Sequence, residues 1–204
     1  MSLYHSGHRR LQDEHDTRRL ADRIDERIVR ETIDDDDRAF IERCDMLFVA
    51  TADADGQPQC SYKGGDPGFV RVLDERTLAY PNYDGNGMYL TAGNVLVNPR
   101  VGLLFISFEE RKRLRLTGVA SHSDDDPLLA EYSEAQFLTR VAVTRVFPNC
   151  PRYIHHYRLV ERSRFVPQEA CRTPVPAWKT REWSHDVLAT NDPAYDPDAE
   201  IFER

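Results

Sequence analysis

Residues 81–94, PNYDGNGMYLTAGN, hold the densest group of side chains that could bind a ligand. The stretch contains three glycines and three asparagines and leads into a predicted helix over about 88–97. Glycines let a ligand approach the backbone closely, and the free N–H groups of a helix N-terminus attract anions. Asparagine amides can donate to and accept from the edge of a heterocycle. The stretch therefore suits a planar ligand that carries an anionic group.

Three tyrosines near this stretch, Tyr80, Tyr83 and Tyr89, could stack on a flat ring. The same residues also suit a plain connection between a strand and a helix. The stretch matches neither the phosphate-binding pattern G-x-x-x-x-G-K-[ST] nor the dinucleotide-binding pattern G-x-G-x-x-G. The residues alone leave both roles open.

Other groups with chemical potential carry weaker signals. His155 and His156 are adjacent, so on a strand they point to opposite faces and cannot share one metal ion. We therefore predict no metal site. Four dispersed cysteines without metal-ligand spacing are expected to be free thiols: Cys44, Cys60, Cys150 and Cys171. No spacing identifies a catalytic triad, so the catalytic residues stay unassigned.

From residue 46 onward the apolar residues follow the period of two that is typical of strands. The turn signal DADG at 53–56 joins the first two strands into a hairpin. Asp126 and Pro127 are expected to begin a helix over 124–137. Sequential hairpins of this kind favour a small barrel or a sandwich. The expected strands are 46–52, 57–62, 69–73, 77–81, 101–108, 113–122, 141–148 and 152–161.

The N-terminal region is expected to be helical only in part. Residues 1–16 are polar and should be loosely held. From Thr17 a helix should dock on the body through Leu20, Ile24 and Ile28, which recur every four residues. The aspartates at 34–37 suit the start of a second helix.

The prolines of the C-terminal tail are expected to prevent regular elements there. We therefore predict three parts: a helical extension at 1–37, a β-barrel domain at 38–167 and a Pro-rich tail at 168–204. We also expect Trp178, in the sequence PVPAWK, to cover the ligand cleft.

Composition narrows the class of protein. The chain has 204 residues and a formal net charge of −8, which argues against nucleic-acid binding because that requires a basic surface. No apolar run approaches the roughly 20 residues of a membrane span, and the N-terminus has no apolar signal-peptide core. We expect a cytoplasmic protein without nucleic-acid or membrane partners.

Residues 48–106 resemble the pyridoxamine 5′-phosphate oxidase-like family of FMN-binding split β-barrel proteins. The resemblance rests on a hairpin with PQ at its second strand, a strand ending in an aromatic before the Gly/Asn loop, a helix, and then NPRVGLLF. The strand RLRLTGVA and the later VFPNCPRYIHHYRLVERSRFVP extend it to roughly residues 40–167. The resemblance implies a mainly β fold, a six-stranded antiparallel Greek-key barrel with flanking helices, and a homodimer that binds FMN at its interface.

The resemblance also implies which residues lie near the flavin. Two strand ends should lie along it, the loop and helix start should lie near the phosphate or ribityl chain, and a second copy should contribute the rest. Lys63 is the best candidate for a cation on the phosphate, with Arg71 and Arg115 as reserves, although each could be a solvated surface residue. The implied residues are Ser61, Tyr62, Lys63 and Gly64, then Tyr80, Pro81 and Asn82, then Asn86, Gly87, Met88 and Asn94, and from the partner Arg115, Asn149 and Arg152.

Two departures from the family pattern affect the expected activity. The oxidases carry a Ser-Arg-Lys run that grips the phosphate, whereas the corresponding residues here are Tyr89, Leu90 and Thr91. They also carry an Arg-x-His that binds the pyridoxine substrate, which none of the seven histidines here reproduces. We therefore expect an FMN-dependent oxidoreductase that transfers hydride between flavin and a small organic substrate or nicotinamide, and not an authentic pyridoxamine phosphate oxidase. The alternatives are a flavin- or haem-binding protein without turnover and a reductase that uses the deazaflavin F420.

Overall fold

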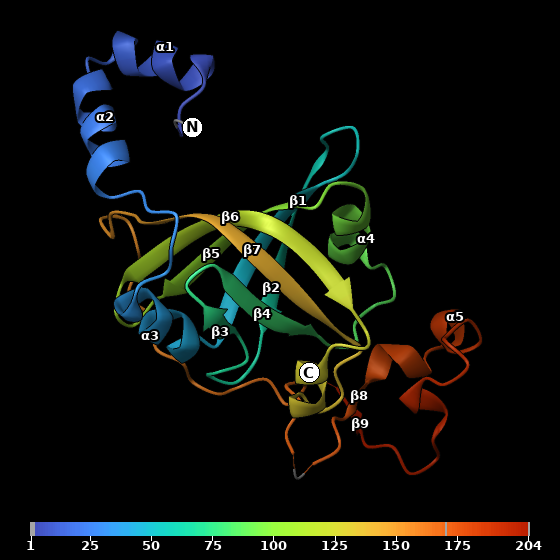
Figure 1. Ribbon diagram of the computed structural model, residues 1–204. Helices are drawn as coiled ribbons and strands as arrows, with labels where there is room; N and C mark the ends of the chain where they lie inside the picture. Colours follow the sequence, from blue (N-terminus) through green and yellow to red (C-terminus); the bar gives the residue numbers. More distant parts are fainter. Residues whose placement is uncertain (1–2, 170, 204) are drawn as a thin grey trace. The chain divides into compact units, whose positions relative to one another are not determined.

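The computed structural model describes residues 3–169 and 171–203, and it divides the chain into two compact units, 1–158 and 159–204 (Figure 1). The first unit contains the β-sheet and the helices that precede it. The second unit contains the C-terminal region. The predicted division into three parts remains a prediction.

The first unit is built on one antiparallel sheet of seven strands. Its order is β2-β1-β5-β6-β7-β4-β3. The pairs β1–β2, β3–β4, β5–β6 and β6–β7 join strands that are consecutive in sequence, whereas β4 pairs with β7, which lies further along the chain. The mainly β prediction is confirmed, although seven strands pair where the resemblance implied six. The strands are β1 (Met46–Ala52), β2 (Pro58–Gly64), β3 (Arg71–Asp74), β4 (Thr77–Asn82), β5 (Arg100–Ser107), β6 (Lys112–Ser123) and β7 (Phe137–Pro148).

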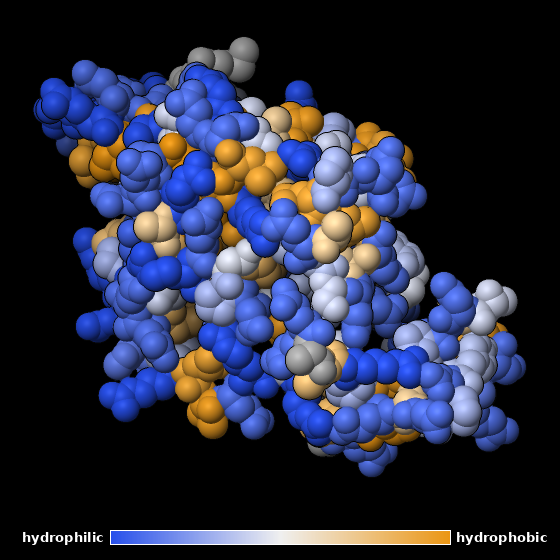
Figure 2. Space-filling model, turned by 60° about the horizontal axis from the view of Figure 1, so that its bottom comes forward, coloured by the Kyte–Doolittle hydropathy of each residue, from blue (hydrophilic) through white to orange (hydrophobic). Residues whose placement is uncertain are grey.

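One face of this sheet forms the hydrophobic core. Alternate residues of β1, β5 and β6 are buried, as the period of two predicts. Leu47 and Val49 of β1 and Leu114 and Leu116 of β6 are each at most 1% exposed. Burial of a side chain of this size contributes about 1.5–3 kcal/mol to folding. On the face shown in Figure 2, hydrophilic residues cover most of the surface and apolar residues form smaller areas between them.

Two predicted turns have the expected chemistry. Gly56 takes a φ of 85° in the β1–β2 hairpin, a conformation that favours glycine. Asp126 caps a short helical turn at Pro127–Glu131, because its carboxylate accepts the N–H of Leu128 at 3.0 Å. That turn is a 3₁₀-helix of five residues instead of the longer helix expected over 124–137.

Three helices precede the sheet: α1 (Ser6–Glu14), α2 (Arg18–Arg27) and α3 (Asp35–Arg43). Asp34 caps α3, as the aspartate run predicts. Within residues 1–16, which we expected to be loosely held, α1 forms as a helix without a buried residue. The expected docking of α2 is wrong, since Leu20 and Ile28 are 61% and 39% exposed.

The predicted strand at 152–161 does not form in the structure. Alternation of side chains predicts a strand only where a partner strand is present, and within the described residues this segment pairs with none. Pro148 ends β7, and Pro151 follows before the segment begins. Its backbone makes a contact with the sheet through the N–H of Tyr157, which donates to the carbonyl of Phe108 at 3.4 Å.

The second unit contains short regular elements where we expected none. Strand β8 (Val175–Pro176) pairs in parallel with β9 (Ile201–Phe202), and α5 spans Glu182–His185. Lys179 forms a salt bridge with Asp192 at 2.7 Å, and both side chains are almost completely buried. The rings of Trp178 and Trp183 stack with their centroids 5.9 Å apart. Among the described helices of the chain, none has the length and apolar character to cross a membrane.

Candidate functional site

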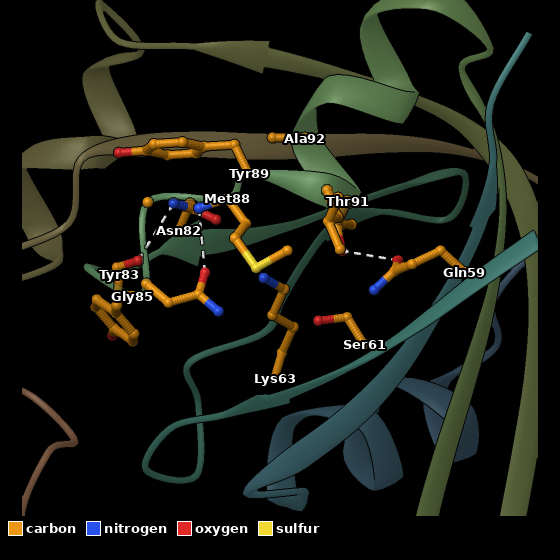
Figure 3. Close-up of a pocket in the computed structure, with 13 residues that line it drawn as sticks. Gln59, Ser61, Lys63, Asn82, Tyr83, Gly85, Met88, Tyr89, Thr91 and Ala92 are labelled. Carbon is orange, nitrogen blue, oxygen red and sulfur yellow. Dashed lines mark hydrogen bonds between the residues drawn. The ribbon is translucent and has the colours of Figure 1, made fainter. Parts of the chain in front are cut away.

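A cleft of about 170 Å³ lies where β2, the end of β4 and the start of helix α4 (Leu90–Val97) meet (Figure 3). Helix α4 packs beside β1, β2 and β6 at one end of the sheet. Most of the stretch 81–94 that we identified from sequence therefore borders this cleft. The lining residues are Gln59, Ser61, Lys63, Asn82, Tyr83, Gly85, Asn86, Gly87, Met88, Tyr89, Leu90, Thr91 and Ala92.

The N-terminus of α4 opens onto the cleft. Its N-cap residue, Tyr89, has a left-handed backbone (φ 48°, ψ 29°), and its side chain does not cap the helix. Leu90, Thr91 and Ala92 line the cleft, and their backbone N–H groups belong to the first turn, which has no carbonyl partners within the helix. Since this first turn holds no acidic residue, the end of the helix keeps its partial positive charge.

The loop before α4 is held by its own polar groups. Asn86 accepts the backbone N–H of Met88 through Oδ1 at 3.1 Å, and Gly87 takes a φ of 74°. Gln136 connects this loop to the end of β4 through two hydrogen bonds. Its Oε1 accepts both the Asn82 amide and the Tyr89 hydroxyl, each at 3.1 Å.

Lys63 is the cation of the cleft. Its side chain is half-buried, and burial lowers the pKa of its ammonium group. Within the described residues no carboxylate pairs with it. A half-buried ammonium group without a counter-ion is unfavourable by itself, so this position favours binding of an anion. The start of α4 supplies positive charge to the same cleft.

Gln59 contributes a fixed amide on the opposite side of the cleft from Asn82 (Figure 3). Its Oε1 accepts the hydroxyls of Thr51 and Thr91, both at 3.2 Å. Asn94 in turn donates from Nδ2 to the hydroxyl oxygen of Thr51 at 3.0 Å. The four residues form a hydrogen-bonded set that joins β1, β2 and α4.

The structure brings together six of the residues that the resemblance implied near the flavin, together with Tyr83 and Tyr89, which we singled out as residues that could stack on a flat ring. The alternation of β2 explains part of this grouping, since every second residue of the strand faces the cleft. The six that line the cleft are Ser61, Lys63, Asn82, Asn86, Gly87 and Met88.

The other singled-out residues lie outside the cleft lining of this chain. Tyr62 is on the opposite face of β2, where its ring packs edge-on against Phe48 with centroids 5.8 Å apart. Tyr80 lies in the core and is 2% exposed. Asn94 points to Thr51. The rest are Gly64 at the end of β2, Pro81 in β4, Arg115 on the exposed face of β6, Asn149 bonded to Arg113, Arg152 after β7, and Trp178 in the second unit.

Sequence reasoning missed Gln59 as a site residue. The period of two that groups Ser61 with Lys63 also points to Gln59, two residues earlier on the same face of β2. Thr91 was missed as well, because its role depends on the hydrogen bond to Gln59.

Comparisons with solved structures find several chains of low sequence identity that are similar to part of this chain. HupZ of Group A Streptococcus is 21% identical, over 57% of this chain and 93% of HupZ, with a TM-score of 0.47. HutZ, the haem storage protein of Vibrio cholerae, is 22% identical, over 56% and 93%, with a TM-score of 0.41. A FAD-binding protein of Mesorhizobium loti is 14% identical, over 60% and 99%, with a TM-score of 0.42. A search of curated protein sequences finds no match.

The sequence model for pyridoxamine 5′-phosphate oxidase matches residues 33–154. This range is more than half of the chain, and it contains all seven strands of the sheet and every residue of the cleft. The chain therefore belongs to the pyridoxamine 5′-phosphate oxidase-like family.

Proposed function

We propose that this protein binds FMN in the cleft between β2 and α4 and works as an FMN-dependent oxidoreductase. The observation that carries the proposal is the half-buried Lys63, whose ammonium has no carboxylate partner among the described residues and shares the cleft with the uncapped start of α4. A phosphate group with nearly two negative charges satisfies both features at once.

The donor set of the cleft also fits the ring system of a flavin. The amides of Gln59 and Asn82 and the hydroxyl of Ser61 line the cleft beside Lys63. The amide nitrogen of Gln59 and the hydroxyl of Ser61 can donate to the carbonyl oxygens and ring nitrogens of the isoalloxazine, and the amide oxygen of Asn82 can accept its N–H. When bound, the flavin supplies two-electron redox chemistry, and the residues of this chain hold and orient it.

We further propose that two copies of the chain complete the site. Small-molecule sites usually enclose about 300–1,000 Å³. The cleft of one chain, at about 170 Å³, is smaller than that range. A homodimer with a flavin at its interface would account for the difference, and it would give Arg115, Asn149 and Arg152 a route to the ligand from the partner copy.

The second candidate function is flavin or haem binding without turnover. It is favoured by the cleft lining, which contains no histidine or carboxylate that could act as acid or base. A third candidate keeps the reductase activity but replaces FMN with F420, another phosphorylated flavin. The matched structures include HutZ, a haem storage protein, and an F420 reductase, so the test below distinguishes FMN from haem and from F420.

The test begins with an absorption spectrum of the purified protein and mass spectrometry of whatever heat releases. A flavin band with the mass of FMN supports the proposal, and reduction of that flavin by NAD(P)H with repeated turnover supports the oxidoreductase role. A bound flavin that shows no turnover with any nicotinamide or added acceptor supports the binding protein. A haem band or the mass of F420 overturns the choice of FMN.

A further inference from the structure

Gln59 belongs to a hydrogen-bonded set of four residues in which the donor and the acceptor of each bond can be named. The amide nitrogen of Asn94 can only donate, so the hydroxyl oxygen of Thr51 accepts from it at 3.0 Å. The proton of the Thr51 hydroxyl is then free to be donated to Oε1 of Gln59 at 3.2 Å. Thr91 donates its hydroxyl proton to the same oxygen, also at 3.2 Å.

Two consequences follow for the Gln59 side chain. Its oxygen already accepts two protons, from threonines that are only 5% and 8% exposed. Its nitrogen is therefore the end that faces the cleft, as Figure 3 shows, and within the described residues it has no hydrogen-bond partner. A flipped amide would donate to both hydroxyl oxygens and turn its own oxygen toward the cleft, whereas in the structure the oxygen accepts from both threonines. The set thus presents an N–H donor to the cleft in a fixed direction.

We propose that Gln59 determines which planar ligand the cleft accepts, by donating a hydrogen bond to an acceptor atom on the edge of the ring. The acceptor class is a carbonyl oxygen or an unprotonated ring nitrogen, and a ring that presents an N–H at that position is disfavoured. Thr51, Thr91 and Asn94 are positioning residues that act through Gln59. The inference rests on the proposed function, because the ligand in question is the flavin.

The donor has a second effect on a bound flavin. Reduction increases the electron density on the ring, so a fixed N–H donor beside an acceptor atom stabilises the reduced form more than the oxidised form. Gln59 is therefore expected to raise the midpoint potential of bound FMN. A residue with a purely structural role would not shift this potential.

The test titrates FMN into the apoprotein, follows the quenching of flavin fluorescence, and measures the midpoint potential. Gln59→Leu should weaken binding by roughly 2- to 10-fold, the usual value of one neutral hydrogen bond, and lower the potential. Gln59→Glu should weaken it further, because a carboxylate offers no donor and adds negative charge. Gln57→Leu, the same change at an exposed position outside the cleft lining of the same hairpin, should have no effect.

The positioning role has its own pair of variants. Thr51→Val removes the hydroxyl with little change in volume, and it should move both affinity and potential in the direction of Gln59→Leu. Thr51→Ser keeps the hydroxyl and should restore both. Melting temperatures of all variants establish that each one folds.

The outcomes separate this inference from the proposed function. If the unsubstituted protein binds FMN but Gln59→Leu matches it in affinity and potential, the inference about Gln59 is overturned and the proposed function stands. If the unsubstituted protein does not bind FMN at all, the proposed function is overturned, and this inference is overturned with it.

Discussion

Replacing Lys63 with methionine should weaken FMN binding and, at the same time, make the protein without ligand more stable. Both effects come from the ammonium group that folding places in the cleft without a carboxylate partner among the described residues. With the phosphate bound, the charge is satisfied. Without it, the charge is partly desolvated and unpaired, which opposes folding.

The size of the binding effect follows from the kind of bond lost. A hydrogen bond to a charged group contributes about 1.5–3 kcal/mol, which corresponds to a roughly 10- to 150-fold change in Kd. Riboflavin has the same ring but no phosphate, so its affinity should barely change. Lys63→Arg keeps the charge and should retain most of the FMN affinity.

The stability effect has a defined sign with pH. Burial lowers the pKa of Lys63 in the folded protein, so between the folded and unfolded pKa values the unfolded chain binds more protons. The unfavourable contribution is thus fully present below the folded pKa, and it disappears as the pH rises from the folded pKa to the unfolded pKa. At neutral pH Lys63→Met should melt at a higher temperature than the unsubstituted apoprotein, and it should lack this pH dependence.

The assay is a fluorescence titration of FMN and riboflavin, together with thermal unfolding of the apoproteins. Lys112→Met is the matched control, because Lys112 lies outside the cleft lining with its ammonium 4.6 Å from the ring centroid of Phe40. An equal loss of FMN and riboflavin affinity in Lys63→Met would refute the role of Lys63 as phosphate partner. A lower melting temperature of that variant would refute the argument from an unpaired charge.

Two further predictions concern other parts of the chain. Gly87→Ala and Gly56→Ala both force a side chain into a left-handed conformation, so each should lower the free energy of unfolding by about 1 kcal/mol. Only Gly87→Ala should also weaken FMN binding in the same titration. Equal effects of the two variants on FMN binding would contradict the role of the loop before α4. Lys179→Met leaves the buried carboxylate of Asp192 without its cation, at a cost of about 3–5 kcal/mol, so limited proteolysis should cleave residues 159–204 faster. Adding Asp192→Leu to this variant should slow the cleavage again. An unchanged cleavage rate in Lys179→Met would count against the salt bridge as a stabilising contact.

The sheet was largely predictable because its signals are local. Period-two alternation located the seven strands of the sheet, and the turn at Gly56 and the cap at Asp126 follow from single residues with known preferences. The failures have one cause in common. The strand expected at 152–161 and the docking expected of α2 both require a partner surface, and the pattern within a segment carries no information about its partner.

The location of the candidate site was predictable from the sequence, but the hydrogen bonds among its residues were not. The Gly/Asn loop, the helix start and the alternation of β2 pointed to most of the lining residues. The role of Gln59 could not be foreseen, because it depends on Thr51, Thr91 and Asn94, which lie up to 35 residues away in sequence from Gln59 and meet it only in the folded chain. Hydrogen bonds of this kind are set by tertiary structure, whereas propensity and periodicity describe one segment at a time.

The chain lacks the Ser-Arg-Lys run with which the oxidases grip the phosphate, but it places another cation, Lys63, in the same cleft as the corresponding residues. The window that holds cations in the oxidases is here Tyr89, Leu90 and Thr91, at the start of α4, and it carries no charged side chain. That window nevertheless lines the same cleft as Lys63, which comes from β2. An anion responds to where a positive charge lies in space and not to which element supplies it. A single lysine on β2, combined with the N–H groups of α4, can thus replace part of the missing run, and because it supplies one charge instead of two, it should hold a phosphate less tightly than that run does.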